Sequence, residues 1–267
     1  MQAPTLSDDR IVVSLSDGIG TILFNDQENL NAFDASSARA FSEAANWLNL
    51  AEDLRVVMLK SATSVFSVGG NVSAFAEVGD HSDKLLLEMT QWFHSAVSLL
   101  MRMDAPVIAV VNGACAGAGA SLPCMADIAI AAESSKLKFA YTAIGIAPDG
   151  GGTFTLPRIV GLRKAYELMV LNTMLSADEA LELGIFNKVV PDDALANEAD
   201  QLAKTLAAGP TKAFGAVKAL LLKSYQQGLE SQLADESVQI SSLSVTADGQ
   251  EGIKAFSAKR SPNFRGS

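Results

Sequence analysis

The sequence has few cysteines, no basic leader segment and no long apolar run. Its two cysteines, Cys115 and Cys124, do not follow the Cys/His spacing of a zinc site. They are also too few for a disulfide framework in a chain of 267 residues, so we expect two small core residues and no metal site. The longest weakly polar stretch, residues 106–132, is interrupted by polar side chains, which excludes a membrane span. The first residues do not resemble a secretory signal, so we expect a cytoplasmic protein.

Positive charge is scarce. The chain has 20 Lys and Arg residues against 30 Asp and Glu residues, which gives a formal net charge of −10 and a pI near 4.7. Such a surface repels phosphate backbones, so nucleic acid is not an expected partner. An anionic ligand must instead meet a local basic cluster, or backbone N–H groups at a loop or helix start.

The order of the predicted elements favours an α/β fold. Hydrophobic residues make up 49% of the chain, and β-rich runs alternate with amphipathic helices up to about residue 190. The first two strands, residues 11–15 and 19–24, are joined by a turn at Asp17-Gly18, and Asp34 can cap the first helix. Further strands are expected over residues 56–59, 107–111, 128–132 and 188–190, and residues 176–179 form a capping-box pattern ahead of a short helix.

Beyond residue 192 the pattern is helical only. Helices are expected over residues 194–208, 210–224 and 229–246, followed by a basic tail. The turn at residues 208–210 divides the chain into a predicted core, residues 1–208, and a predicted helical region, residues 209–267. A helical end of this kind often packs on a neighbouring subunit, so we expect residues 209–267 to serve oligomerisation.

Two glycine-rich segments can present free backbone N–H groups. Residues 66–71 place a glycine pair after a buried strand, and residues 112–121 follow the strand at 107–111 and lead into a helix. In the second segment the N–H groups and the helix dipole converge, which suits an oxyanion. Neither the lysine of a phosphate loop nor the spacing of a dinucleotide fingerprint is present, so ATP and NAD are not expected.

A third segment, residues 143–153, sets Asp149 between a proline and three glycines. An aspartate ahead of a predicted helix is either a helix N-cap or a general base. On the local sequence alone, we favour the N-cap.

Taken together, the three segments resemble the enoyl-CoA hydratase/isomerase, or crotonase, superfamily. The resemblance covers essentially the whole chain, from Asn25 and residues 29–32 to residues 256–264, and is nearest to the epoxyphenylacetyl-CoA isomerase and enoyl-CoA isomerase branch. It implies a crotonase-like spiral of ββα units with a C-terminal helical trimerisation region, assembled as a homotrimer or a dimer of trimers. It also implies an acyl-CoA thioester as substrate, with coenzyme A as part of the substrate and no separate cofactor.

The resemblance assigns the backbone of two residues to an oxyanion hole. The N–H groups of Gly70 and Ala118 would hold the thioester oxygen as an enolate develops, and Gly117 and Gly119 would keep that backbone accessible. The positions that would contact CoA are Asn29, Ala32, Val68, Phe256 and Lys259, of which Phe256 and Lys259 would reach the CoA of a neighbouring subunit. Many family members carry a basic residue where Asn29 stands.

The sequence departs from the family's hydratases at both glutamate positions. Ser121 and Tyr141 stand there instead, so the paired acid–base work of water addition is not expected. Asp149 stands where some isomerases of the family carry a catalytic aspartate. We therefore expect a double-bond isomerase with Asp149 as acid and base. Tyr141 would orient Asp149 or wall the pocket, and Ser121 would hydrogen-bond a water or the substrate.

Other activities of the same fold stay open. Asp149, Tyr141 and His94 also resemble in spacing the arrangement in 4-chlorobenzoyl-CoA dehalogenase, where the aspartate attacks the aromatic ring, a tryptophan stands at the Tyr141 position and the histidine activates water. A lone histidine on a helix is, however, more often a surface or packing residue. A residual enoyl-CoA hydratase and a non-catalytic acyl-CoA-binding relative are the remaining alternatives.

Overall fold

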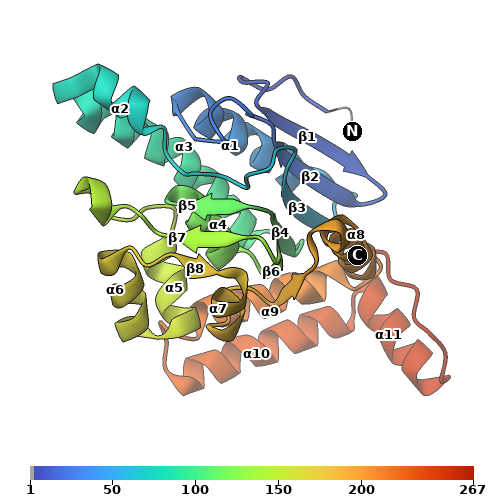
Figure 1. Ribbon diagram of the computed structural model, residues 1–267. Helices are drawn as coiled ribbons and strands as arrows, with labels where there is room; N and C mark the ends of the chain where they lie inside the picture. The colour runs from blue at the N-terminus through green and yellow to red at the C-terminus, as the bar shows by residue number, and fades with distance from the viewer. Residues whose placement is uncertain (1–2) are drawn as a thin grey trace.

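The computed structural model describes residues 3–267. Residues 1–2 lie outside the described residues, and they belong to the N-terminal segment in which we expect no secretory signal. Within this range six strands form the main sheet, in the order β1-β2-β3-β4-β6-β9 (Figure 1). These strands are β1 (Ile11–Ser16), β2 (Ile19–Phe24), β3 (Val56–Ser61), β4 (Val107–Val111), β6 (Ile128–Ala132) and β9 (Lys188–Val190). β1 and β2 pair antiparallel across Asp17 and Gly18, which both have positive φ, and the other pairs are parallel. The predicted hairpin and the strand–helix alternation are confirmed.

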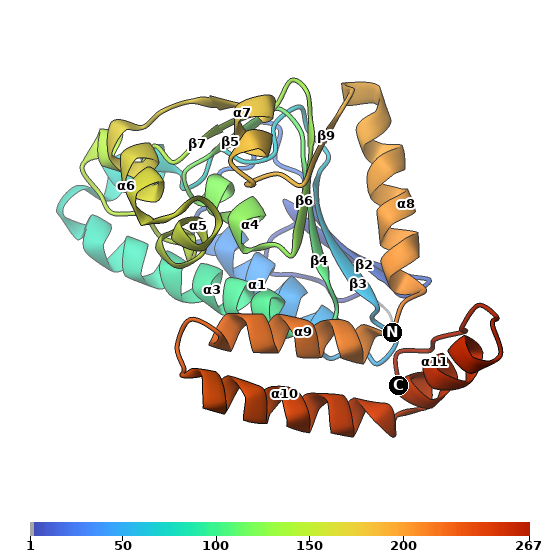
Figure 2. The same ribbon diagram turned by 90° about the horizontal axis from the view of Figure 1, so that it is seen from below.

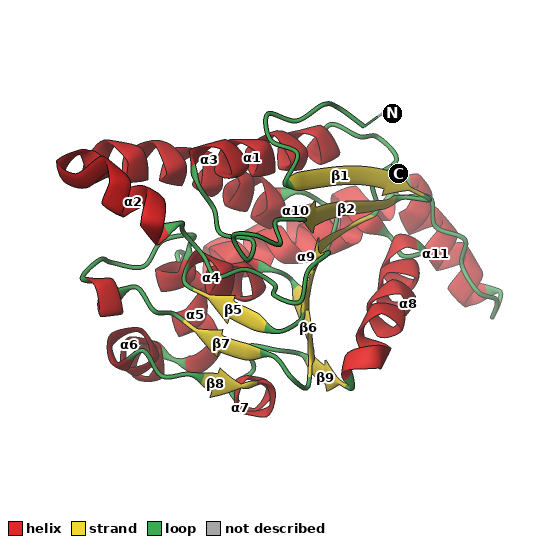
Figure 3. Cartoon of the chain, turned by 45° about the horizontal axis from the view of Figure 1, so that its top comes forward, coloured by secondary structure: helices red, strands yellow, loops and turns green. Residues whose placement is uncertain are grey.

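A smaller sheet lies beside the main one (Figure 3). It consists of β5 (Ala114–Ala116), β7 (Lys136–Lys138) and β8 (Leu175–Ser176). The sequence pattern after β4 predicts only a glycine- and alanine-rich turn and misses β5. This strand is three residues long and depends on pairing with β7 and on a bridge between Ser67 and Cys115, neither of which is visible locally.

Helices cover both faces of the main sheet. The N-terminal two thirds of the chain contain α1 (Ala35–Asn49), α2 (Val72–Val78), α3 (Ser82–Arg102), α4 (Ala118–Met125), α5 (Gly152–Val160), α6 (Leu162–Leu171) and α7 (Ala177–Glu182). α1 and α3 lie on one face and α8 (Leu195–Ala207) on the other (Figure 2). Along β3, Val57 and Leu59 pack in the core between the sheet and helices α1 and α3, whereas Val56 and Met58 pack in the core between the sheet and α8. Burial on both faces explains the unbroken apolar run of this strand.

The predicted helix starts are confirmed at two sites. The Asp34 carboxylate accepts the backbone N–H of Ser37 and begins α1. Ser176 and Glu179 form the predicted capping box at the start of α7. Each cap satisfies N–H groups that a helix start leaves without intrahelical acceptors.

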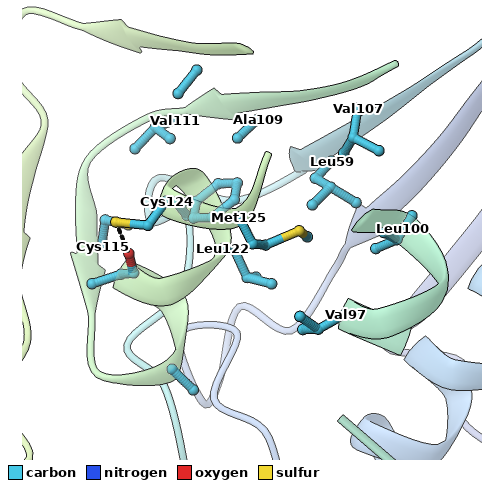
Figure 4. Packing of buried hydrophobic residues seen from close by; sticks show 14 of the residues in the cluster. Leu59, Val97, Leu100, Val107, Ala109, Val111, Cys115, Leu122, Cys124 and Met125 are labelled. Atoms are coloured by element: carbon cyan, nitrogen blue, oxygen red, sulfur yellow. Dashed lines mark hydrogen bonds between the residues drawn. The ribbon is translucent and has the colours of Figure 1, made fainter. Parts of the chain in front are cut away.

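The two cysteines are small core residues, as predicted. Cys115 and Cys124 lie buried among apolar side chains and are not bonded to each other (Figure 4). The Cys115 thiol donates to the carbonyl of Gly119 at 3.2 Å. Burial raises the pKa of the Cys124 thiol to about 12 and that of Cys115 well above its ordinary value. Both thiols are therefore neutral at physiological pH.

After residue 208 every element of secondary structure is a helix. α9 (Thr211–Lys223), α10 (Leu229–Ser244) and α11 (Ala247–Ser257) follow one another, and α10 has no buried residue in the isolated chain. The stretch expected to be a basic tail contains α11, whose start is capped by Thr246. No helix within residues 3–267 is long and apolar enough to span a membrane.

Lys218 makes polar contacts between α9 and the core. The Lys218 ammonium lies 2.6 Å from the Asp127 carboxylate and donates to the carbonyls of Leu100 and Ala105, where α3 ends. The Lys218 side chain is only 9% exposed. Burial raises the pKa of Asp127 despite this ion pair, so the carboxylate depends on Lys218 for its compensation.

We expect Lys218→Ala to lower the free energy of unfolding by about 2–3 kcal/mol, since it removes the cation from Asp127, which then keeps only the N–H of Val107, and leaves two carbonyls without the Lys218 donor. Chemical denaturation at one fixed protein concentration measures this loss. Lys212→Ala, at an exposed position of the same helix, is the matched control and should change stability by less than about 0.5 kcal/mol. Equal stability of the two variants would show that the Lys218 contacts do not fasten α9.

Candidate active site

A cavity of about 390 Å³ opens where the three glycine-rich segments meet α2 and α3. Its wall is mostly apolar and includes Val68, Phe75, Leu86, Met89, Phe93, Ile144 and Ile146. Among the described residues that line it, Asp149 is the one charged side chain. A carboxylate in apolar surroundings interacts strongly with any proton or charge placed beside it.

Two backbone segments form one side of this cavity and touch without intervening side chains. The N–H of Ala116 donates to the carbonyl of Ser67 at 2.9 Å, which joins residues 66–71 to residues 112–121. Gly69 has a φ of +90°, and a Cβ there would lie 2.8 Å from the Ala116 carbonyl oxygen. A Cβ at Gly119 would collide with the Ser67 carbonyl oxygen. Gly119 therefore allows the two segments to pack, and the expectation that it keeps the backbone accessible stays a prediction.

The N–H groups of Gly70 and Ala118 are free on the cavity wall. Both residues line the cavity, and neither N–H group donates a hydrogen bond to another of the described residues. Ala118 is the first residue of α4, and Gly117 before it has a φ of +53°. A helix start leaves its first N–H groups without intrahelical acceptors. Two such donors on one wall have the arrangement that stabilises an oxyanion.

Asp149 is not a helix N-cap. α5 begins at Gly152 with Gly151 as the capping residue, and no side chain accepts an N–H group there. The positive φ angles of Gly150 and Gly151 turn the chain so that the Asp149 carboxylate meets Tyr141 instead. The Tyr141 hydroxyl donates to Asp149 Oδ1 at 2.6 Å. The N-cap interpretation fails because it assumes a direct entry into the helix, whereas the two glycines reverse the chain first.

Tyr141 both walls the cavity and holds Asp149. Its ring lines the cavity, and its side chain is nearly fully buried. Burial and the neighbouring Asp149 carboxylate raise the pKa of Tyr141 far above its ordinary value. The phenol therefore stays neutral and remains a hydrogen-bond donor to the carboxylate.

Ser121 lies behind the cavity wall and not on it. Its side chain is fully buried, and its hydroxyl donates to the backbone carbonyl of Asp149 at 3.0 Å. A Cβ on either Gly150 or Gly152 would press against Ser121, so the glycines allow this contact. Ser121 does not line the cavity, so its expected hydrogen bond to water or the substrate stays a prediction. The Ser121 hydroxyl fixes the turn that carries Asp149.

His94 contacts the same turn from the other side. Its Nε2 atom accepts the N–H of Gly150 at 3.0 Å, and its ring faces a second cavity rather than the apolar one. The resemblance to the dehalogenase grouped His94 with Asp149, but it did not show that His94 contacts the backbone N–H of Gly150, which lies 56 positions further along the chain.

The five residues expected to contact CoA are not brought together in one chain. Val68 lines the cavity, whereas Ala32 is buried and Asn29 donates its side-chain amide to the Asp26 carboxylate. Phe256, in α11, is 87% exposed, and Lys259 follows directly after this helix. α11 lies at the opposite end of the molecule from α2 and α6 (Figures 1 and 2). Phe256 and Lys259 therefore do not reach the cavity of their own chain.

Metal-ligating side chains do not cluster in residues 3–267. No group of three or more His, Cys, Asp or Glu side chains lies close enough together to hold a metal ion in that part of the chain.

The sequence and the fold are similar to those of known proteins over nearly the full length of the chain. The sequence model described as enoyl-CoA hydratase/isomerase matches residues 14–267. A 1,2-epoxyphenylacetyl-CoA isomerase from Escherichia coli (strain K12) is 34% identical over 96% of this chain and 98% of its own. A 4-chlorobenzoyl coenzyme A dehalogenase from an Arthrobacter species is 31% identical over 84% of this chain and 82% of its own.

A solved structure has the same fold. The crystal structure of an enoyl-CoA hydratase from Polaromonas sp. JS666 matches with a TM-score of 0.90 and 29% identity, over 96% of this chain and 99% of the other. The expected crotonase-like α/β fold with a helical C-terminal region is confirmed. The chain belongs to the enoyl-CoA hydratase/isomerase, or crotonase, family of enzymes.

Proposed function

We propose that the protein isomerises a carbon–carbon double bond in an acyl-CoA thioester through an enolate. One observation supports this most strongly: the free N–H groups of Gly70 and Ala118 share an apolar cavity with the carboxylate of Asp149. The reaction needs a site for the oxyanion and one group that moves a proton, and this arrangement offers a candidate for each.

The N–H groups of Gly70 and Ala118 bind the thioester oxygen as it gains charge. Donors aimed at charge that appears only in the transition state are worth about 3–4 kcal/mol each. The apolar wall strengthens these hydrogen bonds because it excludes water. Coenzyme A enters as part of the substrate, and no further cofactor takes part.

Asp149 moves the proton. With a 3-enoyl thioester it takes a proton from the carbon next to the carbonyl, and the C–H electron pair enters a conjugated enolate. The same carboxyl group then returns the proton to the far carbon of the old double bond. The double bond now lies next to the carbonyl, and the oxyanion reverts to the carbonyl. Tyr141 stays neutral and holds the carboxylate at the cavity throughout.

Water addition is disfavoured by the residues around Asp149. Syn hydration requires groups that deprotonate a bound water while they protonate the neighbouring carbon. Ser121 is buried against the Asp149 carbonyl, and Tyr141 has a raised pKa and donates to the Asp149 carboxylate. One carboxylate suffices for a proton shift along the acyl chain.

The proposed assembly is a homotrimer or a dimer of trimers. In such an assembly Phe256 and Lys259 would complete the CoA site of a neighbouring subunit. This agrees with their exposure and their distance from the cavity of their own chain.

Asp149→Asn should abolish isomerisation and proton exchange, with a loss of at least 100-fold, because the amide cannot accept the proton. Affinity for a saturated thioester, measured by calorimetry, should stay largely intact. NMR of the protein with a 3-enoyl-CoA thioester in D₂O follows deuterium entry at the α and γ carbons and the movement of the double bond.

Binding without exchange in the wild-type protein would contradict an isomerase. The dehalogenase alternative then predicts an aryl ester on Asp149 and halide release with 4-chlorobenzoyl-CoA, which mass spectrometry detects. Binding without either reaction would indicate a non-catalytic relative.

Tyr141→Phe keeps the ring in the cavity wall and removes only the hydroxyl that donates to Asp149. A hydrogen bond to a charged group is worth about 1.5–3 kcal/mol, so we expect kcat to fall about 10- to 100-fold. KM should change less than about twofold, because the oxyanion donors remain. Tyr166→Phe, at an exposed position in α6, is the control. A raised KM with unchanged kcat would mean that Tyr141 serves binding alone.

A further inference from the structure

A second cavity, of about 690 Å³, lies on the other side of Asp149. We call it the rear chamber. α3, the turn at residues 148–154 and α9 with the residues just after it form its walls. Asp149 is the one described residue that lines both the apolar cavity and the rear chamber. The residue proposed to move the proton therefore borders both spaces.

The charges of the rear chamber differ from those of the apolar cavity. Arg102, Lys223 and His94 line it, and Asp149 is its only acidic residue within the described part of the chain. Arg102 and Lys223 thus give this chamber two cations against one carboxylate, in a protein with a net charge of −10. A local basic cluster is the feature that lets such a protein bind an anionic group.

Arg102 is the cation that is available to a ligand. Lys223 already pairs with Asp235 at 2.9 Å. Arg102, at the end of α3, is exposed and forms no ion pair or side-chain hydrogen bond with any residue from 3 to 267. Its planar guanidinium can bind a carboxylate through two parallel hydrogen bonds.

The rear chamber is long enough to separate Arg102 from Asp149. His94, which contacts Gly150 next to Asp149, and Arg102 lie eight residues apart on α3. At 1.5 Å per residue this spacing is about 12 Å along the helix axis. Apolar side chains, including Val97, Met101 and Leu222, line the chamber as well. Methylene groups would fit along this wall, with an anionic end kept away from the Asp149 carboxylate.

The opposite wall is held in place. Lys218 of α9 donates to the carbonyls of Leu100 and Ala105, on either side of Arg102 in the sequence. The face of α9 that carries Ala219, Leu222 and Lys223 is therefore fixed relative to the end of α3. The rear chamber is a formed cavity of the isolated chain.

We propose that the acyl group of the substrate passes beside Asp149 into the rear chamber and ends in a carboxylate that Arg102 binds. This inference rests on the proposed function and narrows its substrate class to CoA thioesters of dicarboxylic acids. The thioester end lies at Gly70 and Ala118, the reacting carbons lie at Asp149, and the free carboxylate lies at Arg102.

The test compares two saturated CoA thioesters of equal chain length, one ending in a methyl group and one in a carboxylate. Calorimetry measures their affinities for the wild-type protein, for Arg102→Gln and for Arg163→Gln. Arg163 is an exposed residue of α6 that lines neither cavity. Arg163→Gln changes the net charge of the protein by the same amount as Arg102→Gln and therefore serves as its control. We expect Arg102→Gln to weaken the carboxylate-ended thioester about tenfold and to leave the methyl-ended one unchanged. Arg163→Gln should change neither.

The other outcomes overturn the inference in different ways. An equal loss for both thioesters in Arg102→Gln would mean that Arg102 binds the CoA phosphates and not the acyl end. No loss for either would remove Arg102 from binding and leave the proposed isomerase intact. Failure of both thioesters to bind the wild-type protein would overturn the proposed function together with the inference.

Discussion

The close contact between two backbone segments, residues 66–71 and 112–121, is the constraint on which the site depends. At this contact the carbonyl of Ser67 meets the N–H of Ala116, and neither Gly69 nor Gly119 has room for a Cβ. The segments follow β3 and β4, which pair in parallel, so the sheet brings the two segments together on one face. Beside this contact the N–H groups of Gly70 and Ala118 lie on the cavity wall without an acceptor among residues 3–267, so the electrostatic environment of the site follows from the packing.

Local sequence signals predicted the parts of the fold that local interactions determine. The Asp17-Gly18 hairpin, the cap at Asp34 and the capping box at Ser176 each depend on residues within a few positions, and all three are confirmed. β5 and α11 were missed because the first is defined by pairing with distant segments and the second lies in a stretch whose basic residues suggested a tail. The resemblance of the three glycine-rich segments to the crotonase family was sufficient to predict the fold.

The chemistry around Asp149 was only partly predictable. The sequence marked Asp149, Tyr141, Ser121 and His94 as candidate residues, but it did not show how they are arranged in space. In the folded chain Tyr141 reaches the carboxylate, Ser121 reaches the carbonyl of the same residue, and His94 reaches the next N–H group. Three elements thus hold one short turn. A turn with three consecutive glycines is intrinsically flexible, so holding it in one conformation costs backbone entropy. The contacts that hold it come from distant parts of the chain, which the local sequence does not reveal.

The two buried cysteines have a consequence for how the protein responds to its chemical environment. Their thiols are neutral and enclosed, so alkylating agents and oxidants meet no thiolate on the folded protein. Cys124 lies within α4, the helix that begins at Ala118. Thiol modification therefore requires that the packing around this helix open first. The rate of modification reports how often the scaffold of the Ala118 N–H group loses its structure.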